Sequence, residues 1–210
     1  MHLSPTHHHK ILLSNKNVQT GSRIGGTPPE AIAENTVCPE CKRKIQYVLT
    51  LGNDILGEHI GNNELSFFVC KDFDCRWDGQ AVIHPSPLIF IVHPVSPRKK
   101  DPTDMDSPCD ALGFYRGELE PDFVDEESGY CDDSKLGGKP TYIQSRGEEE
   151  VEEIQKEGYE FFFQYSQPVF PDEFSGGTDP FGFGVVYVFA KKDAATGLMD
   201  CNNIRAFWLK

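Results

Sequence analysis

The sequence predicts a β-rich α+β protein, made of two internally duplicated β-sheet units packed into one compact body. A phrase of the form Ser-basic-aliphatic-Gly-Gly-x-Pro occurs twice, at residues 22–28 and 134–140, and strand-like runs rich in aromatic residues follow each copy. The chain also has 15 Phe and 7 Tyr among its 210 residues, which supply the large apolar side chains that a core requires. The expected layout is a flexible leader at 1–20, a first repeat unit at 21–97, an acidic connector at 98–133 and a second repeat unit at 134–210.

The elements of the first unit follow from its turn residues. The Gly-Gly pair at 25–26 predicts a tight turn with positive φ. The run 45–51 is rich in β-forming residues, and turn residues at 52–54 separate it from a second strand at 65–70. Three prolines interrupt the apolar segment 81–95, so an edge strand or a crossover is expected there rather than a central strand.

The connector and the second unit differ in composition. The connector combines prolines with many carboxylates, which predicts a surface insertion with short turns or helical pieces. The acidic stretch 148–157 has apolar residues only at Val151 and Ile154, and their spacing of three predicts a short helix with one apolar stripe. Three further strands are expected, at 159–165, 185–190 and 204–209.

The two units can be aligned by eye. The alignment places residues 65–69 against residues 185–189. A strand needs partners on both edges and a cover for its apolar face, and two such units can supply these to each other. The two units are therefore expected to form one compact body with a pseudo-twofold relation, and not two independent domains.

The chain is acidic, with a formal net charge of −13. Phosphate backbones and anionic lipid surfaces both attract basic proteins, so neither nucleic acid nor a membrane surface is an expected partner. The longest apolar run, 88–92, is far shorter than the roughly 20 residues of a membrane span. Residues 1–20 contain no signal-peptide core, so a cytoplasmic location is expected. The acidic surface serves either solubility or the binding of a basic protein.

Four cysteines of the first unit have the spacing of a zinc-ribbon-like metal site: Cys38, Cys41, Cys70 and Cys75. A Cys-x-x-Cys pair places two thiolates on one tight turn, which suits two corners of a zinc tetrahedron. The second pair is separated by four residues, and the two pairs flank a β-rich stretch. A redox role for the first pair would favour a following helix that lowers the thiol pKa, whereas a strand follows here. The expected cofactor is a structural zinc ion.

The remaining cysteines and histidines offer weaker candidates. Cys109, Cys131 and Cys201 have no near cysteine in the sequence and are expected to be ordinary small apolar residues. His84 and His93 are alternative metal ligands, but each precedes a proline in a Pro-rich run, which favours ordinary edge or surface histidines.

The chain contains no familiar catalytic motif: Gly-x-Ser-x-Gly, a phosphate loop and His-Glu-x-x-His are all absent. A zinc ion held by four cysteines has no open coordination position, so it stiffens the fold without activating water. The expected function is a non-catalytic binding protein of chaperone or immunity type, with a basic protein as partner. The alternative is an enzyme with an active-site cleft between the two repeat units, where Phe161, Phe163 and Tyr187 line a pocket instead of filling the core.

The turn phrase, the Cys-Pro-x-Cys pair and the LSFFVC strand together resemble the YwqG-like family of largely uncharacterised bacterial domains. Members carry an SKLGG-P turn, as at 134–140, an FxxQ strand, as at 161–164, and a YVF-type strand, as at 187–189. The chain departs from that pattern at Tyr142, where the family has tryptophan, and in its acidic connector. The resemblance implies a mixed β-rich fold with internal duplication and no assigned reaction.

A shorter stretch, comprising the Gly-Gly-x-Pro turn, the paired cysteines and the two strands, is also similar to the programmed-cell-death-protein-two family. This similarity implies binding of a basic client, because that family is linked to the chaperoning of ribosomal proteins.

Overall fold

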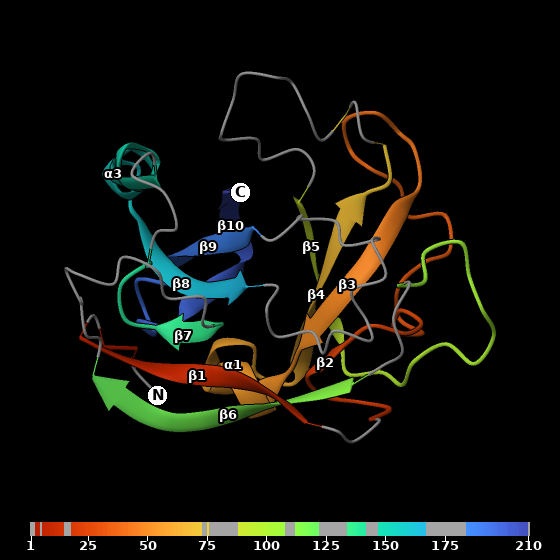
Figure 1. Ribbon diagram of the computed structural model, residues 1–210, viewed down its shortest axis with the longest axis horizontal. Coiled ribbons are helices and arrows are strands. Elements are labelled where there is room, and N and C mark those ends of the chain that lie inside the picture. The colour runs from red at the N-terminus through yellow and green to blue at the C-terminus, as the bar shows by residue number, and fades with distance from the viewer. Residues whose placement is uncertain are drawn as a thin grey trace. The chain divides into compact units, whose positions relative to one another are not determined.

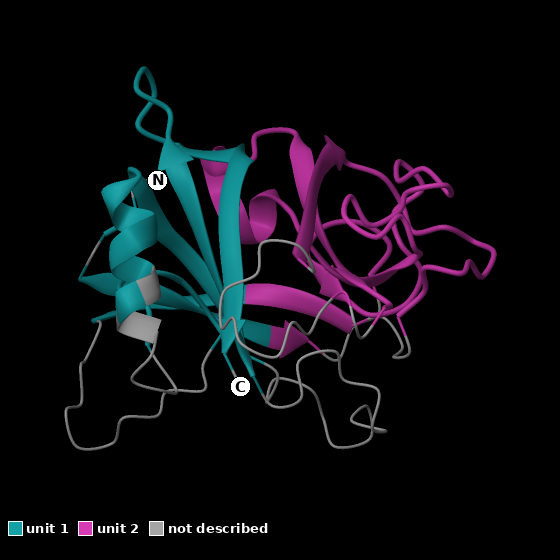
Figure 2. Cartoon of the chain, turned by 90° about the horizontal axis from the view of Figure 1, so that it is seen from above, with its two compact units in different colours: residues 1–12, 116–210 teal, residues 13–115 magenta. Residues whose placement is uncertain are grey.

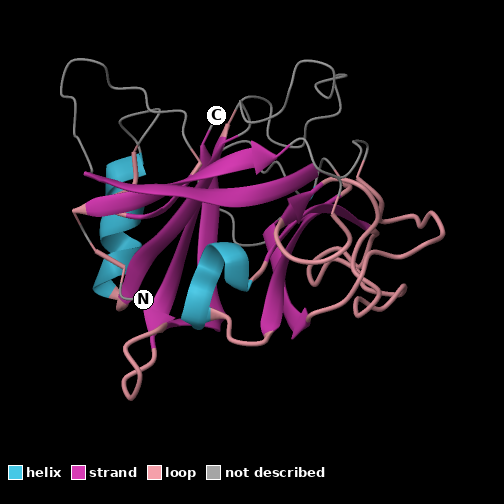
Figure 3. Cartoon of the chain, turned by 90° about the horizontal axis from the view of Figure 1, so that it is seen from below, coloured by secondary structure: helices cyan, strands magenta, loops and turns pink. Residues whose placement is uncertain are grey.

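The computed structural model describes residues 3–4, 6–14, 18–72, 75, 88–107, 112–121, 134–141, 147–166 and 184–209. Antiparallel strands dominate this part of the chain, and its helices are short (Figure 3). The chain divides into two compact units (Figure 2): unit 1 comprises residues 1–12 and 116–210, and unit 2 comprises residues 13–115. None of the helices in the described residues has the length and apolar character needed to cross a membrane.

Unit 2 contains a four-stranded antiparallel meander with the strand order β2-β3-β4-β5 (Figure 1). Its strands are β2 (Arg23–Ile24), β3 (Ile45–Leu51), β4 (Asn63–Cys70) and β5 (Leu88–Pro94). A short helix, α1 (Asn53–Leu56), and a 3-10 turn, η1 (Gly57–His59), connect β3 to β4, where the sequence predicts only a turn. Among the described strands β5 pairs with β4 alone, as expected for an edge strand.

Unit 1 contains a second antiparallel meander, with the order β7-β8-β9-β10. Its strands are β7 (Lys135–Gly137), β8 (Tyr159–Ser166), β9 (Val185–Lys192) and β10 (Met199–Leu209). The helix α3 (Gly147–Lys156) contacts β8. Val151 and Ile154 are buried, which confirms the predicted helix and its apolar stripe.

Among the described residues, four strands are not predicted by the sequence: the short strands β2 and β7, which precede the Gly-Gly turns, and the longer strands β1 and β6. β1 (His7–Ser14) lies in the expected flexible leader, and β6 (Leu112–Pro121) lies in the expected acidic connector. β1 pairs with β7 in unit 1, and the first residues of β6 pair with β2 in unit 2. Both segments are therefore paired β-strands, and the boundaries of the two units differ from the expected ones. In β1 only His8 and Ile11 are buried, so the strand has no apolar alternation that could identify it.

The two meanders have the same strand register. In each, the strand after the Gly-Gly turn carries one bulged residue, Val48 on β3 and Phe162 on β8. A bulge of this kind twists the strand and displaces its pairing by one residue. The register after the bulge places Leu65 of β4 in the position that Val186 occupies on β9. The alignment by eye, which sets Leu65 against Val185, is therefore wrong by one residue.

The two Gly-Gly turns also have the same backbone conformation. The glycines at 25–26 have φ of 75° and 73°, and those at 137–138 have φ of 77° and 75°. Glycine is the residue that enters this left-handed region without steric cost, which explains why both copies of the phrase contain two glycines.

A serine before each turn makes equivalent hydrogen bonds. The backbone N–H of Gly52 donates to Ser22 Oγ at 2.8 Å, and the backbone N–H of Ser166 donates to Ser134 Oγ at 2.9 Å. Both serines are buried. Each hydroxyl therefore connects the residue before β2 or β7 to the end of the neighbouring long strand.

Candidate metal centre

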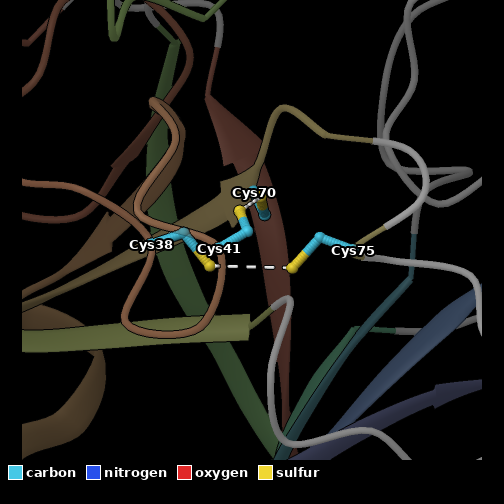
Figure 4. A group of neighbouring side chains, drawn as sticks. All are labelled: Cys38, Cys41, Cys70 and Cys75. Carbon is cyan, nitrogen blue, oxygen red and sulfur yellow. Dashed lines mark hydrogen bonds between the residues drawn. The ribbon is translucent and has the colours of Figure 1, made fainter.

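The four cysteines predicted to bind metal lie together in unit 2 (Figure 4): Cys38, Cys41, Cys70 and Cys75. Their Sγ atoms all lie within 4.8 Å of one another, so the cluster could hold a metal ion. Two contacts join the first cysteine pair to the second, with Cys41 Sγ and Cys70 Sγ 3.4 Å apart and Cys38 Sγ and Cys75 Sγ 3.8 Å apart. A tetrahedron with metal–sulfur bonds of ~2.3 Å has sulfur–sulfur edges of about 3.8 Å. The cluster has the size of one tetrahedral site.

The first cysteine pair lies on a compact turn at 37–44, whose ends form an antiparallel bridge. Within it, the N–H of Cys38 donates to the carbonyl of Arg43 at 2.9 Å, and the N–H of Lys42 donates to the carbonyl of Cys38 at 3.0 Å. Lys42 has a φ of 61°, a left-handed conformation that residues other than glycine seldom adopt. This reversal brings Cys38 and Cys41 to the same site.

The second cysteine pair is positioned by the β-sheet. Cys70 is the last residue of β4 and pairs with Ile45, the first residue of β3, so the sheet places it beside the end of the first turn. The N–H of Asp72 donates to Cys70 Sγ at 3.4 Å. Cys75 follows shortly after and completes the cluster.

Further contacts connect the turn at 37–44 to residues 71 and 72, which follow β4. The N–H of Lys71 donates to the carbonyl of Lys44 at 3.1 Å, which extends the sheet pairing beyond β4. Arg43 Nη1 lies 3.2 Å from Asp72 Oδ2. Lys44 and Lys71 both donate to Asp104, from a later part of unit 2. The site is therefore held by backbone and side-chain contacts as well as by its cysteines.

Burial and hydrogen bonding act differently on the individual thiols. Cys38 and Cys70 are fully buried, whereas Cys41 and Cys75 are partly accessible. Burial raises the pKa of the Cys70 thiol, because desolvation disfavours the thiolate. The backbone N–H of Arg43 lowers the pKa of the Cys41 thiol, because it donates to the sulfur. The thiolate is the form that binds a metal, and a bound cation offsets the cost of burying its charge.

The cluster lies at one side of the hydrophobic core of unit 2. Cys38 and Cys70 pack in this core with five further buried residues: Ile32, Ile45, Tyr47, Phe68 and Met105. The N–H of Tyr47 donates to the carbonyl of Met105 at 2.7 Å, and this hydrogen bond joins β3 to the segment that contains Met105. A metal ion at this site would connect the turn at 37–44 to the strands that form the core.

Unit 2 also contains a buried ion pair and a buried hydrogen-bond chain, which the sequence does not predict. Arg23 Nη1 and Glu64 Oε1 lie 3.2 Å apart, and both side chains are fully buried. Beside this ion pair, hydrogen bonds of 2.7 to 2.8 Å link side chains of three successive strands: Tyr47, Thr50, Ser66 and His93. In the sequence these residues stand out only as polar positions within otherwise apolar strands. That pattern does not indicate which of them form hydrogen bonds with one another.

Among the described residues, the other candidates that the sequence offers lie outside the cluster. His93 bonds to Ser66 and is not part of the metal-ligand group found among the described residues. Cys201 is buried in β10 of unit 1, and burial raises its pKa to about 12. The rings proposed for an active-site cleft are all buried: Phe161, Phe163 and Tyr187. Three candidates lie outside the described residues: His84, Cys109 and Cys131.

Comparisons with known proteins find no family model, no curated protein and no solved structure that matches the chain.

Proposed function

We propose that unit 2 binds a structural zinc ion through Cys38, Cys41, Cys70 and Cys75. The observation that carries this proposal is the convergence of four Sγ atoms, from two separate parts of unit 2, within 4.8 Å of one another. Four sulfur ligands in a tetrahedron suit zinc or iron, and at a given site Zn²⁺ generally binds more tightly than Fe²⁺. Four protein ligands leave no open position, so the ion would brace the fold and would not activate water.

Metal analysis of the purified protein tests the zinc site. We expect about one equivalent of zinc per chain, because one four-cysteine cluster holds one ion. Cys38→Ser should remove the zinc, whereas the control Cys201→Ser, in β10 of unit 1, should keep it. A wild-type protein without zinc, or a Cys38→Ser variant that retains the full amount, would overturn the proposal.

We propose that the protein acts in the cytoplasm as a non-catalytic binding protein for a basic protein partner, in a chaperone-type or immunity-type role. The net charge of −13 supports this role, because complementary charge speeds encounter and selects the partner. In unit 1, α3 carries exposed carboxylates at Glu149, Glu152 and Glu153. A reducing cytoplasm also suits the four thiols of the proposed zinc site.

A pull-down at low ionic strength tests the partner. We expect basic proteins to be retained and then released as the salt concentration rises, because screening weakens exposed charges. The double variant Glu149→Gln with Glu153→Gln should retain less of the same partner, whereas a neutral exchange such as Gln155→Asn should not change retention. If no basic protein is retained at low salt, the proposed role is wrong.

We propose that the two meanders are copies of one ancestral unit. Their common strand order, the bulges at Val48 and Phe162 and the matching Gly-Gly turns support this origin. We also propose that the chain is a divergent relative of the YwqG-like family, on the motifs that resemble it. In a crystal structure, β2–β4 should superpose on β7–β9 with the two bulges aligned, and failure to superpose would refute the duplication.

A further inference from the structure

We infer that the cysteine cluster is also a site of reversible oxidation, at which a peroxide joins Cys41 to Cys70 and Cys38 to Cys75. The loss of zinc that should accompany oxidation rests on the proposed zinc site, but the disulfides themselves do not.

Two sulfur–sulfur contacts and the exposure of the four residues support this pairing. In each pair, sulfurs from different parts of unit 2 lie 3.4 Å or 3.8 Å apart, so a small side-chain movement would bring them to bonding distance. Each pair also combines one partly exposed residue, Cys41 or Cys75, with one fully buried residue, Cys70 or Cys38. The oxidant can approach the partly exposed residue, and the thiol of the buried residue lies near enough to form the disulfide.

The chemistry needs one peroxide for each disulfide. The Cys41 thiolate attacks one oxygen of hydrogen peroxide, the O–O bond breaks, and a sulfenic acid and hydroxide form. The Cys70 sulfur then attacks the sulfenic sulfur, the S–S bond forms and the S–O bond breaks, and the second hydroxide leaves. With the two thiol protons, both hydroxides become water, so two thiols lose two electrons and one peroxide gains them. A second peroxide oxidises Cys38 and Cys75 in the same way.

Oxidation and metal binding exclude each other at this cluster. A thiolate is a zinc ligand, whereas a sulfur in a disulfide carries no charge and binds zinc poorly. The first disulfide removes two of the four ligands, so the zinc ion should leave with it. Reduction restores the four thiols and the metal site.

Cys201 is the internal control. It is 6% exposed, lies in β10 of unit 1 and is not part of the cluster. A reaction that depends on the cluster should leave this thiol unmodified, whereas general oxidation of the protein would modify it as well.

The sequence allows each disulfide to be identified. Glu40 lies between Cys38 and Cys41, and Lys71 lies between Cys70 and Cys75. Cleavage after lysine and glutamate therefore puts the four cysteines on four different peptides. The full chain is used, with Cys109→Ser and Cys131→Ser, so that the only cysteines left are the cluster and Cys201.

The experiment treats the zinc-loaded protein with hydrogen peroxide, blocks the remaining thiols by alkylation, digests the protein without reductant and maps the linked peptides by mass spectrometry. A coloured zinc chelator follows metal release in a parallel sample. We expect links between Cys41 and Cys70 and between Cys38 and Cys75, two thiols lost per peroxide, zinc release with the first disulfide, and recovery of all thiols on reduction.

Three outcomes would overturn the inference: thiols that survive peroxide, sulfinic or sulfonic acids without disulfides, or a disulfide within one turn, such as Cys38–Cys41, as the main product. If the purified protein contains no zinc but forms the two expected disulfides, the zinc proposal fails and the inference stands. If the protein binds zinc and the thiols survive peroxide, the zinc proposal stands and the inference fails.

Discussion

Arg23 and Glu64 form an ion pair in which neither side chain is exposed to solvent. Glu64 also accepts a hydrogen bond from the N–H of Gly21 at 2.8 Å. Removing one charge from such a pair leaves the other buried and uncompensated, so Glu64→Gln should lower the free energy of unfolding by about 3–5 kcal/mol. Urea unfolding of the variant measures this loss.

The matched control is Glu157→Gln. Glu157 pairs with Arg205 at 2.7 Å, but both side chains are nearly half exposed. Exposed pairs contribute roughly 0–1 kcal/mol, so the control should unfold almost as the natural chain does. Equal losses in the two variants would show that burial does not set the strength of these pairs.

His93 should make the stability of the protein depend on pH. Burial lowers its pKa, with Arg23 acting in the same direction and the Pro94 carbonyl and Glu64 acting against it. As the pH falls, His93 therefore binds a proton more readily in the unfolded chain than in the folded chain. The contribution of neutral His93 is complete above the unfolded pKa of ~6.5 and is lost as the pH falls below it, by at most about 1.4 kcal/mol per pH unit.

Unfolding of the natural chain and of His93→Gln at pH 7 and at pH 5.5 tests this dependence. The natural chain should lose more stability between the two pH values than the variant, since glutamine does not titrate. If both lose the same amount, His93 is not the group responsible.

Some contacts of single residues could be predicted from the sequence, and others could not. The cysteines could be predicted because Cys-x-x-Cys has a local geometry that a metal requires. The contacts of Arg23 could not, because Glu64 is distant in the sequence and no spacing connects the two. The sequence offers His93 as an alternative metal ligand, whereas in the structure its side chain hydrogen-bonds to Ser66.

At the scale of elements, the two serines before the Gly-Gly turns should contribute similar stability. Each hydroxyl accepts a hydrogen bond from a buried backbone N–H, Ser22 from Gly52 and Ser134 from Ser166. Ser22→Ala and Ser134→Ala would each leave that donor unsatisfied, at a cost of about 1–3 kcal/mol. Thermal unfolding measures both, and a variant that loses nothing would contradict the equivalent roles of the two turns.

Elements with a strong local pattern could be predicted from the sequence. β3 occupies 45–51 as expected, because β-branched and apolar residues fill it, and α3 is identified by Val151 and Ile154 in an acidic stretch. β1 and β6 could not be predicted, because their strand conformation comes from pairing with distant strands and not from their own composition.

At the scale of the whole molecule, removing the metal should affect the two units differently. All four cysteines belong to unit 2, where they join the turn at 37–44 to β3 and β4. Chelation should therefore increase amide hydrogen exchange in 37–44 and at the start of β3, while β8 and β9 of unit 1 remain protected. Uniform loss of protection across both units would contradict a local bracing role.

The division of the chain also shows what the sequence cannot specify. The repeated phrase indicates two related units, but it does not say that residues 1–12 join the second meander. That assignment depends on which distant strand β1 pairs with, and the partner is β7. Pairing over more than a hundred residues leaves no local pattern in the chain.

The central claim is that one metal ion is bound by four sulfurs. X-ray absorption at the zinc edge of the purified protein measures the ligands directly. We expect four sulfur neighbours at ~2.3 Å and no nitrogen or oxygen in the first shell. A shell containing nitrogen or oxygen, or fewer than four sulfurs, would contradict the site formed by Cys38, Cys41, Cys70 and Cys75.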